Sequence, residues 1–402
     1  MPKLRFPGFE GEWERTAFNS LFSILKNNTL SRAELTDSGT IKNIHYGDIL
    51  VKFDDFIKVE NPMIPYVKDT VTLKYEMDYL QSGDIVIADT AEDDTVGKAT
   101  EIINPTNIPV VSGLHTIPCR PNKIFASSYL GYYINSSAYH KQLYPFMQGI
   151  KVTSISKGNI RKTTISYPSN NEQHKIANFL ILVSVRIEKQ HQLIETLKKY
   201  KRGVMRDIFR DKDILYSKET KWNSVRLGDE CTFFSGGTPK SNDSSYYGGA
   251  IPFIRSGEIH GEKTELFLTD AGLKNSSAKM VSKGDLIVAL YGATSGEVDI
   301  SKIDGAINQA ILCIRPAVIN KIFLKYLLED SKENILNIYL QGGQGNLSAE
   351  IIKNLVFDIP DVRSQASVAY FLSIIDRRIN SLLVCLEKLT ALRSGMMQQL
   401  FI

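Results

Sequence analysis

The chain has 402 residues, of which 43% are hydrophobic and 23% are charged, and its formal net charge is +4 at pH 7. This composition is typical of a folded chain with two or three domains and argues against a largely disordered one. No run of about 18 apolar residues occurs and no apolar segment follows Met1–Arg5, so we expect neither a membrane span nor a secretory signal, and a cytoplasmic location.

Residues 1–167 form the first predicted domain, an α+β globule. Short apolar runs that begin with Gly-Asp, such as Gly47–Val51 and Gly83–Ile87, are typical of strands bounded by turns. The pattern of Ser127–Leu143 predicts one amphipathic helix. The acidic residues within Asp89–Asp94 lack the spacing of a calcium-binding loop, so we interpret this segment as a solvated loop.

Residues 168–210 form a predicted long helix. It begins after Pro168 and a Ser-Asn-Asn turn, and it contains no further proline. Apolar residues recur at heptad spacing, interrupted once by Gln190. The expected helix-pairing positions are Ile176, Val183, Leu197 and Val204. A helix of about 37 residues spans roughly 55 Å, more than a small domain, so its apolar seam needs a partner.

A second predicted helix supplies such a partner. Residues 211–221 form a polar linker, residues 222–358 a second predicted globular domain, and residues 359–402 the second long helix. The expected pairing positions of this helix are Val368, Ile375, Leu382, Leu389 and Met396.

The two halves of the chain are copies of one another. Pro168–Phe209 and Pro360–Phe401 align without a gap, and Gly83–Ile85 in the first globule corresponds to Gly284–Leu286 in the second. The chain is therefore predicted to be a tandem duplication of globule plus helix. Either orientation of the helix pair is sterically allowed. We expect an antiparallel coiled coil, which places one globule at each end and gives a pseudo-two-fold axis.

The sequence shows no motif of a catalytic, metal or cofactor site. It contains neither a Walker loop nor a strand-linked G-x-G-x-x-G, and no G-x-S-x-G accompanies its serines. The four cysteines are isolated, which favours buried reduced side chains, and the six histidines lack H-E-x-x-H spacing. We therefore predict no catalytic residue, no cofactor and no metal, which favours recognition over catalysis.

The positive charge is concentrated in the first half of the chain. One basic run lies within Lys151–Lys162 and another within Lys198–Arg210. Such runs suit contact with a polyanion, although a charged run can equally be a solvated face.

Several stretches resemble the specificity subunits of type I restriction-modification systems. In the first half these are Leu4–Phe9 with Trp13, Ile44–Ile49, Asp84–Thr90 and Val111–Thr116. In the second half they are Gly236–Pro239, Gly284–Thr294 and Asn308–Ile311. The resemblance covers essentially the whole chain, and the order globule, helix, globule, helix is its most specific feature.

The resemblance implies a function. Each globule would be a target recognition domain that reads one half of a bipartite DNA sequence, and the paired helices would fix the unread spacer. Two methyltransferase subunits and two motor-nuclease subunits would be the protein partners on double-stranded DNA, and this chain would have no catalysis of its own.

Reading bases in the major groove needs side chains such as Arg, Lys, Asn and Gln on exposed loops. In the first domain the candidates are Lys26, Asn27, Asn28, Lys42, Asn43, Tyr46, Lys98, Lys151, Thr153 and Lys157. In the second domain they are Thr238, Lys240, Arg255, Ser256, Tyr291, Thr294, Gln309, Gln344 and Asn346. For each residue taken singly, an ordinary surface or turn position is the competing interpretation.

Two other functions stay open at this point. The chain could be a coiled-coil interaction protein whose globules bind proteins or small ligands, which the modest net charge allows. It could also be a nucleic-acid enzyme whose site carries no recognisable motif.

Overall fold

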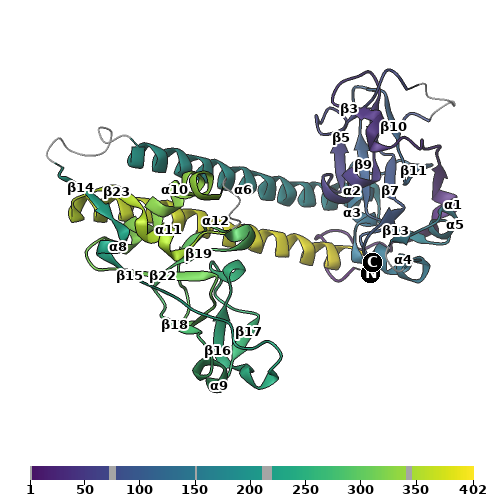
Figure 1. Cartoon of the computed structure of the whole chain (residues 1–402). Coiled ribbons are helices and arrows are strands. Elements are labelled where there is room, and N and C mark those ends of the chain that lie inside the picture. Colours follow the sequence, from purple (N-terminus) through teal and green to yellow (C-terminus); the bar gives the residue numbers. More distant parts are fainter. Residues whose placement is uncertain (1, 72–77, 150–151, 211–219, 341–345) are drawn as a thin grey trace. The chain divides into compact units, whose positions relative to one another are not determined.

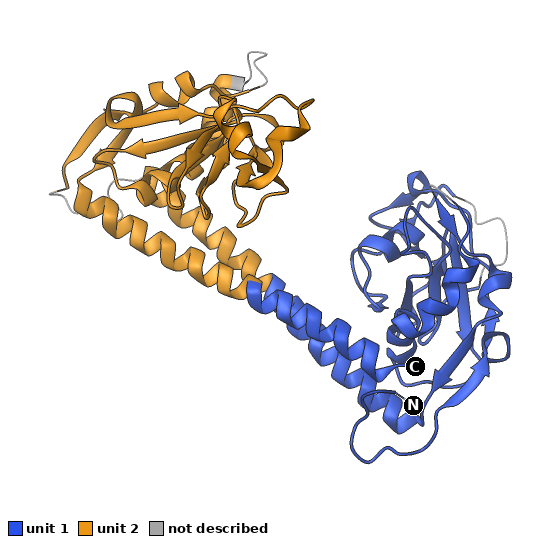
Figure 2. Cartoon of the chain, turned by 90° about the horizontal axis from the view of Figure 1, so that it is seen from below, with its two compact units in different colours: residues 1–191, 384–402 blue, residues 192–383 orange. Residues whose placement is uncertain are grey.

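The computed structural model describes residues 2–71, 78–149, 152–210, 220–340 and 346–402. The chain divides into two compact units, which Figure 2 shows in different colours. Unit 1 contains residues 1–191 and 384–402, and unit 2 contains residues 192–383. In the described ranges, none of the helices combines the length and the apolarity that a membrane crossing requires.

Unit 1 is built on a five-stranded sheet in the order β2-β11-β7-β9-β5. Strands β5, β9, β7 and β11 are labelled in Figure 1. All neighbours are antiparallel except β5 and β9, which are parallel. The central strand β7 is buried on both faces: Ile85 and Ile87 join one hydrophobic cluster, and Val86 and Ala88 join another. This follows from the alternation of side chains along a strand. The strands are β2 (Phe22–Ile24), β5 (Phe56–Lys58), β7 (Ile85–Ala88), β9 (Ala99–Ile103) and β11 (Thr116–Pro121).

A second sheet and two short strand pairs complete the β-structure of unit 1. The four-stranded sheet has the order β10-β4-β6-β3, with β10 and β4 parallel. Its strands are β3 (Leu35–Thr36), β4 (Lys42–Ile44), β6 (Tyr66–Val67) and β10 (Val110–Ser112). The pairs are β1 (Glu14–Ala17) with β13 (Thr164–Tyr167), and β8 (Thr90–Ala91) with β12 (Thr153–Ser154).

The short helices of unit 1 correct two sequence expectations. Gly47–Val51, predicted as a strand, is helical, because the His45 ring accepts a hydrogen bond from the Gly47 amide (3.2 Å) and caps the helix start. Ser127–Leu143 is two helices rather than one, because the Asn135 side chain bonds both backbone groups of Ala99 in strand β9. The helices are α1 (Phe18–Leu21), η1 (Arg32–Glu34), α2 (Tyr46–Val51), α3 (Tyr129–Ile134), α4 (Ser137–Leu143), η2 (Tyr144–Phe146) and α5 (Lys157–Ile160).

Unit 2 has two four-stranded sheets, in the orders β15-β22-β19-β20 and β17-β16-β21-β18, and the pair β14-β23. The strands are β14 (Trp222–Arg226), β15 (Cys231–Ser235), β16 (Tyr247–Ile254), β17 (Leu266–Leu268), β18 (Lys279–Val281), β19 (Leu286–Ala289), β20 (Val298–Ile300), β21 (Gly305–Ile307), β22 (Ile311–Pro316) and β23 (Val356–Pro360). The helices of its globule are α8 (Leu227–Glu230), η3 (Ser244–Tyr246), η4 (Ser256–Glu258), α9 (Asp270–Lys274), η5 (Gly292–Thr294), α10 (Lys321–Leu340) and α11 (Ala349–Asn354).

The same bonds recur in both globules and confirm the duplication. In unit 1 Arg120 pairs with Asp84 at 2.7 Å, and in unit 2 Arg315 pairs with Asp285 at 2.6 Å. Each carboxylate also accepts a hydrogen bond from the backbone amide three residues upstream. It thereby joins the turn before β7 or β19 to the arginine of the neighbouring strand, β11 or β22. The repeat in the sequence is therefore a repeat of contacts.

The two long helices are α6 (Asn170–Arg210) and α12 (Val362–Leu400). In unit 1 the beginning of α6 shares a core with the end of α12, since Ile176 and Leu180 lie in one cluster with Met397 and Leu400. In unit 2 the last part of α6 lies beside the first part of α12, because Lys201 pairs with Asp376 at 2.8 Å. Each unit thus contains antiparallel pieces of both helices (Figure 2), as expected.

None of the heptad positions expected to pair is exposed. Four of them are buried: Ile176, Val368, Ile375 and Leu382. The others are half-buried: Val183, Leu197, Val204, Leu389 and Met396. Gln190, which interrupts the seam in the sequence, is also buried.

Candidate nucleic-acid interface

In unit 1 five loops converge where strand β7 ends. The backbone amide of Asp89 donates to the carbonyl of His115 (3.1 Å), and the carbonyl of Asp89 accepts from the amide of Ile155 (2.8 Å). The amide of Asn28 donates to Ser112 (2.8 Å), and the amide of Gly113 donates to Ile44, also at 2.8 Å. These long-range bonds join residues 26–28, 43–46, 89–90, 113–115 and 153–157 into what we call the unit 1 loop cluster.

The asparagines of this cluster lie at two depths. Asn27 is half-buried; its amide donates to the carbonyl of Gly113 (3.2 Å), and its side-chain oxygen accepts from the exposed ammonium of Lys157 (3.0 Å). Asn28 and Asn43 are buried and bonded to each other at 2.7 Å. Asn28 and Asn43 therefore support the loops from beneath, because their side chains do not reach the surface.

The ammonium groups of two candidate lysines donate hydrogen bonds to backbone carbonyls of unit 1. Lys42 is buried, and its ammonium donates to the carbonyls of Val59 (2.6 Å) and Asn61 (2.9 Å). Lys98 donates to the carbonyl of Leu50 (3.0 Å). Burial lowers the pKa of both lysines. These bonds leave them poorly placed to contact a phosphate.

The remaining candidates of unit 1 are spread over the cluster. Lys26 is exposed, and Thr153 lies half-buried on β12. Tyr46 packs between two histidines, with its ring centroid 4.7 Å from that of His45 and 5.2 Å from that of His115. Lys151 lies outside the described residues. His115 was not among the sequence candidates, although it belongs to Val111–Thr116, one of the stretches that carry the family resemblance.

Unit 2 contains an equivalent loop cluster, which is held by backbone hydrogen bonds at positions that correspond to those of unit 1. The amide of Leu290 donates to Ala310 (2.8 Å), and the carbonyl of Leu290 accepts from Leu347 (3.0 Å). Thr238 donates its hydroxyl proton to Gln309 (2.7 Å). These contacts bring together four sequence candidates from separate loops: Thr238, Tyr291, Gln309 and Asn346.

The other candidates of unit 2 differ in their contacts and in their exposure. Ser256 lies on η4 and Thr294 on η5, and these two elements contact each other. Arg255 is held by Glu258 and Glu265, and these side-chain hydrogen bonds raise the pKa of its guanidinium. Lys240 is exposed. Gln344 lies outside the described residues.

The basic residues within Lys198–Arg210 do not all lie on one exposed face of α6. Lys201 is buried and pairs with Glu329 (2.7 Å) and Asp376 (2.8 Å) of its own unit. It lies seven residues after the buried Ile194 and seven before the buried Ile208, which places it on the packed side of α6. Lys201 is thus part of the packing and not a contact for a polyanion.

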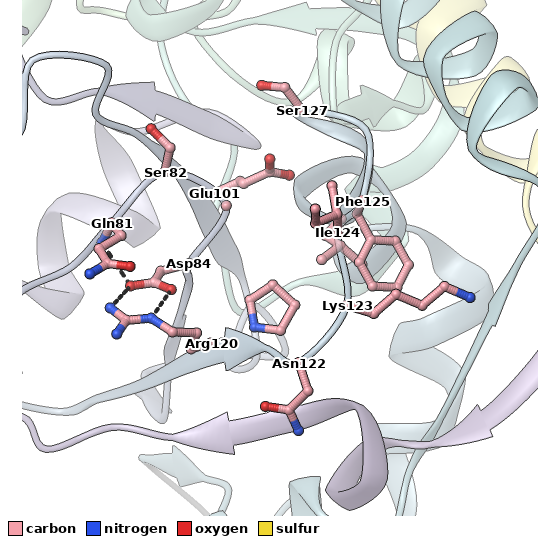
Figure 3. Close-up of a pocket in the computed structure, with 13 residues that line it drawn as sticks. Gln81, Ser82, Asp84, Glu101, Arg120, Asn122, Lys123, Ile124, Phe125 and Ser127 are labelled. Atoms are coloured by element: carbon pink, nitrogen blue, oxygen red, sulfur yellow. Dashed lines mark hydrogen bonds and ion pairs between the residues drawn. The ribbon is translucent and has the colours of Figure 1, made fainter.

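Unit 1 also contains a pocket of about 350 Å³, drawn in Figure 3. Its polar groups bond within the unit: Asp84 pairs with Arg120, and Glu101 accepts from the amides of Ser128 (2.6 Å) and Gly131 (2.9 Å). Burial raises the pKa of Glu101 to about 7 despite these bonds. The pocket lies at the start of β7 and the end of β11, so it is separated from the loop cluster by the length of these strands.

No metal centre emerges from the parts of the chain that are described, where no three His, Cys, Asp or Glu side chains gather as ligands. Cys119, Cys231 and Cys313 are buried, as the sequence predicted, whereas Cys385 is half-buried. Asp93, in the acidic segment of unit 1, accepts from Thr95 and lies in an exposed turn.

Comparison with known proteins agrees with this architecture. Residues 10–199 and 219–384 match the family model described as type I restriction modification DNA specificity domain. A Methanocaldococcus jannaschii protein named as the MjaX type I restriction enzyme specificity subunit is 22% identical over 383 residues, covering 91% of this chain and 87% of its own.

Two solved structures share the fold over nearly their whole length. The S subunit of a type I restriction-modification system from M. genitalium superimposes with a TM-score of 0.61 at 16% identity, covering 100% of this chain and 99% of its own. A chain from a study of complex assembly and conformational transition of the type I system gives 0.60, also at 16% identity, with 98% of each chain covered.

The duplicated α+β globules with antiparallel helices thus define a DNA-specificity protein of the restriction-modification class. The chain belongs to the type I restriction modification DNA specificity family, and it is a specificity subunit of such a system.

Proposed function

We propose that each unit reads one half of a bipartite DNA sequence through its loop cluster. The observation that carries this proposal is the equivalence of the two clusters, which rest on the same pattern of backbone bonds but present different side chains. A constant framework with variable loops suits a protein that reads two unrelated half-sites. Lys98 and Arg255 are half-buried, but their charged groups are bonded within their own units. The other exposed or half-buried candidates are Lys26, Asn27, Tyr46, Thr153, Lys157, Thr238, Lys240, Ser256, Tyr291, Thr294, Gln309 and Asn346.

The chemistry of these side chains fits the two tasks of a DNA reader. Gln309 and Asn346 carry amides, which pair with adenine edges in the major groove. The amide nitrogen of Asn27, in contrast, already donates to the carbonyls of Asn28 (3.3 Å) and Gly113 (3.2 Å). Lys26, Lys157 and Lys240 carry ammonium groups, which suit phosphates and guanine edges. The supporting Asn28–Asn43 bond would hold the loops of unit 1 in place while they contact the duplex.

The paired helices would set the length of the unread spacer between the half-sites. Their 41 and 39 residues are continuous, with no proline inside either helix. A helix fixes 1.5 Å per residue, so its length is a rigid measure.

We further propose that this chain scaffolds two methyltransferase and two motor-nuclease subunits in the cytoplasm, and that it has no catalysis of its own. Two equivalent copies of a partner need two equivalent surfaces, and the duplicated helices offer them. Leu182 on α6 is 68% exposed, and Ile374, its counterpart in the repeat, is 43% exposed on α12. Exposed apolar side chains at matched positions suit a repeated contact with helical partners.

Exchange of the first domain tests the reading model. Residues 1–165 would be replaced by the corresponding domain of another family member, and methylated bases would be mapped in cells that carry the chain with its methyltransferase partner. We expect one half-site to change while the other half-site and the spacer stay the same. A change in both half-sites would contradict the assignment of one half-site to each unit.

A further inference from the structure

His115 has a backbone conformation that is uncommon for residues with a Cβ. Its φ is +54°, in the left-handed region, and its side chain is 46% exposed in the middle of the unit 1 loop cluster. A side chain with a Cβ is strained in this region, and such strain is concentrated at functional sites. The surrounding structure therefore holds a strained histidine at the surface of the unit 1 loop cluster.

The contacts of His115 orient its ring. Its Nδ1 lies 3.3 Å from Oδ1 of Asp89, and the same oxygen accepts the hydroxyl proton of Thr90 at 2.8 Å. Nδ1 also lies 3.3 Å from the Thr90 hydroxyl. Because a carboxylate only accepts, Nδ1 donates to Asp89, and when the ring is neutral its Nε2 is an acceptor. The Tyr46 ring packs against the His115 ring in an edge-to-face arrangement, with their centroids 5.2 Å apart.

The second unit shows that the fold does not require these side chains. The backbone bond from Asp89 to His115 recurs as the bond from Leu290 to Ala310. The positions of Asp89 and His115 thus hold Leu290 and Ala310 in unit 2, where neither side chain is polar. Asp89, Thr90 and His115 therefore occur in unit 1 but not at the corresponding positions of unit 2, on a framework that both units share.

We propose that His115 is a base-contacting residue that helps determine the half-site read by unit 1. Its Nε2 accepts a hydrogen bond from an exocyclic amino group in the major groove, which adenine and cytosine provide. Asp89 is a positioning residue that holds the ring in this tautomer. The inference rests on the proposed function, because it names the contact that one loop cluster makes.

The test uses His115→Gly in the full chain with its methyltransferase partner, and it maps methylated sites. Glycine removes the ring and also relieves the left-handed backbone, so the variant is expected to be as stable as the parent or more stable. We expect preference at one base position of the unit 1 half-site to fall by about 5- to 150-fold, as for the loss of one base contact. The unit 2 half-site is the internal control.

Three further variants make the result specific. Asn107→Gly relieves an equally left-handed residue, with φ +53°, in an exposed turn of unit 1, and it should leave both half-sites unchanged. Asp89→Leu, which copies unit 2, should weaken preference at the same base position as His115→Gly. A His115→Asn variant, which also tolerates this backbone, replaces the glycine variant if that one folds poorly.

The outcomes separate the inference from the function on which it rests. If His115→Gly methylates with the parent's base preferences, like Asn107→Gly, the inference is overturned and the reading function stands. If the parent complex methylates without any sequence preference, the reading function itself fails and takes the inference with it.

Discussion

Lys201 offers a direct test of how the long helix α6 is held against unit 2. Its side chain is only 10% exposed, and it lies with Lys325 between two carboxylates, Glu329 and Asp376. The Tyr326 hydroxyl also donates to Asp376 at 2.7 Å. Lys201→Met keeps the apolar stem and removes the charge, which leaves two carboxylates with a single lysine.

The cost follows from burial. Breaking a fully buried ion pair costs about 3–5 kcal/mol, because an uncompensated charge remains. Asp376 and Glu329 are 27% and 36% exposed, so solvent screens part of this and we expect about 2 kcal/mol. For a unit of this size that corresponds to a fall in Tm of about 4–8 °C.

The assay is calorimetric unfolding of the full chain, with Lys198→Met as the matched control. Lys198 lies on the same helix but forms an exposed pair with Glu195, so its replacement should cost less than about 0.5 kcal/mol. Adding Asp376→Asn to Lys201→Met should restore part of the stability, because it removes the uncompensated charge. Equal Tm values for the two lysine variants would refute the packing argument.

The remaining predictions concern pH and the helices. His260 bonds Asp299 (2.8 Å) and Glu297 (3.4 Å), and the Asp299 bond chiefly raises its pKa. The stabilisation by His260 is thus complete below about pH 6.5 and is lost as the pH rises through the raised value. His260→Ala should therefore lower Tm more at pH 5.5 than at pH 9 in thermal scans, and equal shifts at both would contradict the linkage. Inserting seven residues at matched positions of α6 and α12 should lengthen the spacer by about three base pairs and keep both half-sites, as read from methylated sites. A change in half-site sequence would exclude the helices as a ruler.

The candidate residues show how much of the site could be predicted from the sequence. Asn27 and Asn43 looked alike as amides in turn-rich segments, yet Asn43 is fully buried beneath the loops and Asn27 lies at their surface. Lys201 looked like one member of a basic run, although its spacing from Ile194 and Ile208 already placed it on the packed side. His115 gave no signal by residue type, because its φ and its contact with Asp89 depend on a loop 26 residues away.

The sequence by itself determined the features that repeat locally. Heptad spacing is a local periodicity, so the two long helices and their apolar seams followed from residues a few positions apart, and the duplication followed from comparing one half with the other. The sequence allowed either orientation of the helix pair and favoured the antiparallel one, whereas the tertiary structure alone decided which distant loops meet at the end of β7. The reason is that those loops are held by backbone hydrogen bonds between residues far apart in the chain, such as Asp89 with Ile155, and backbone groups are the same in every sequence.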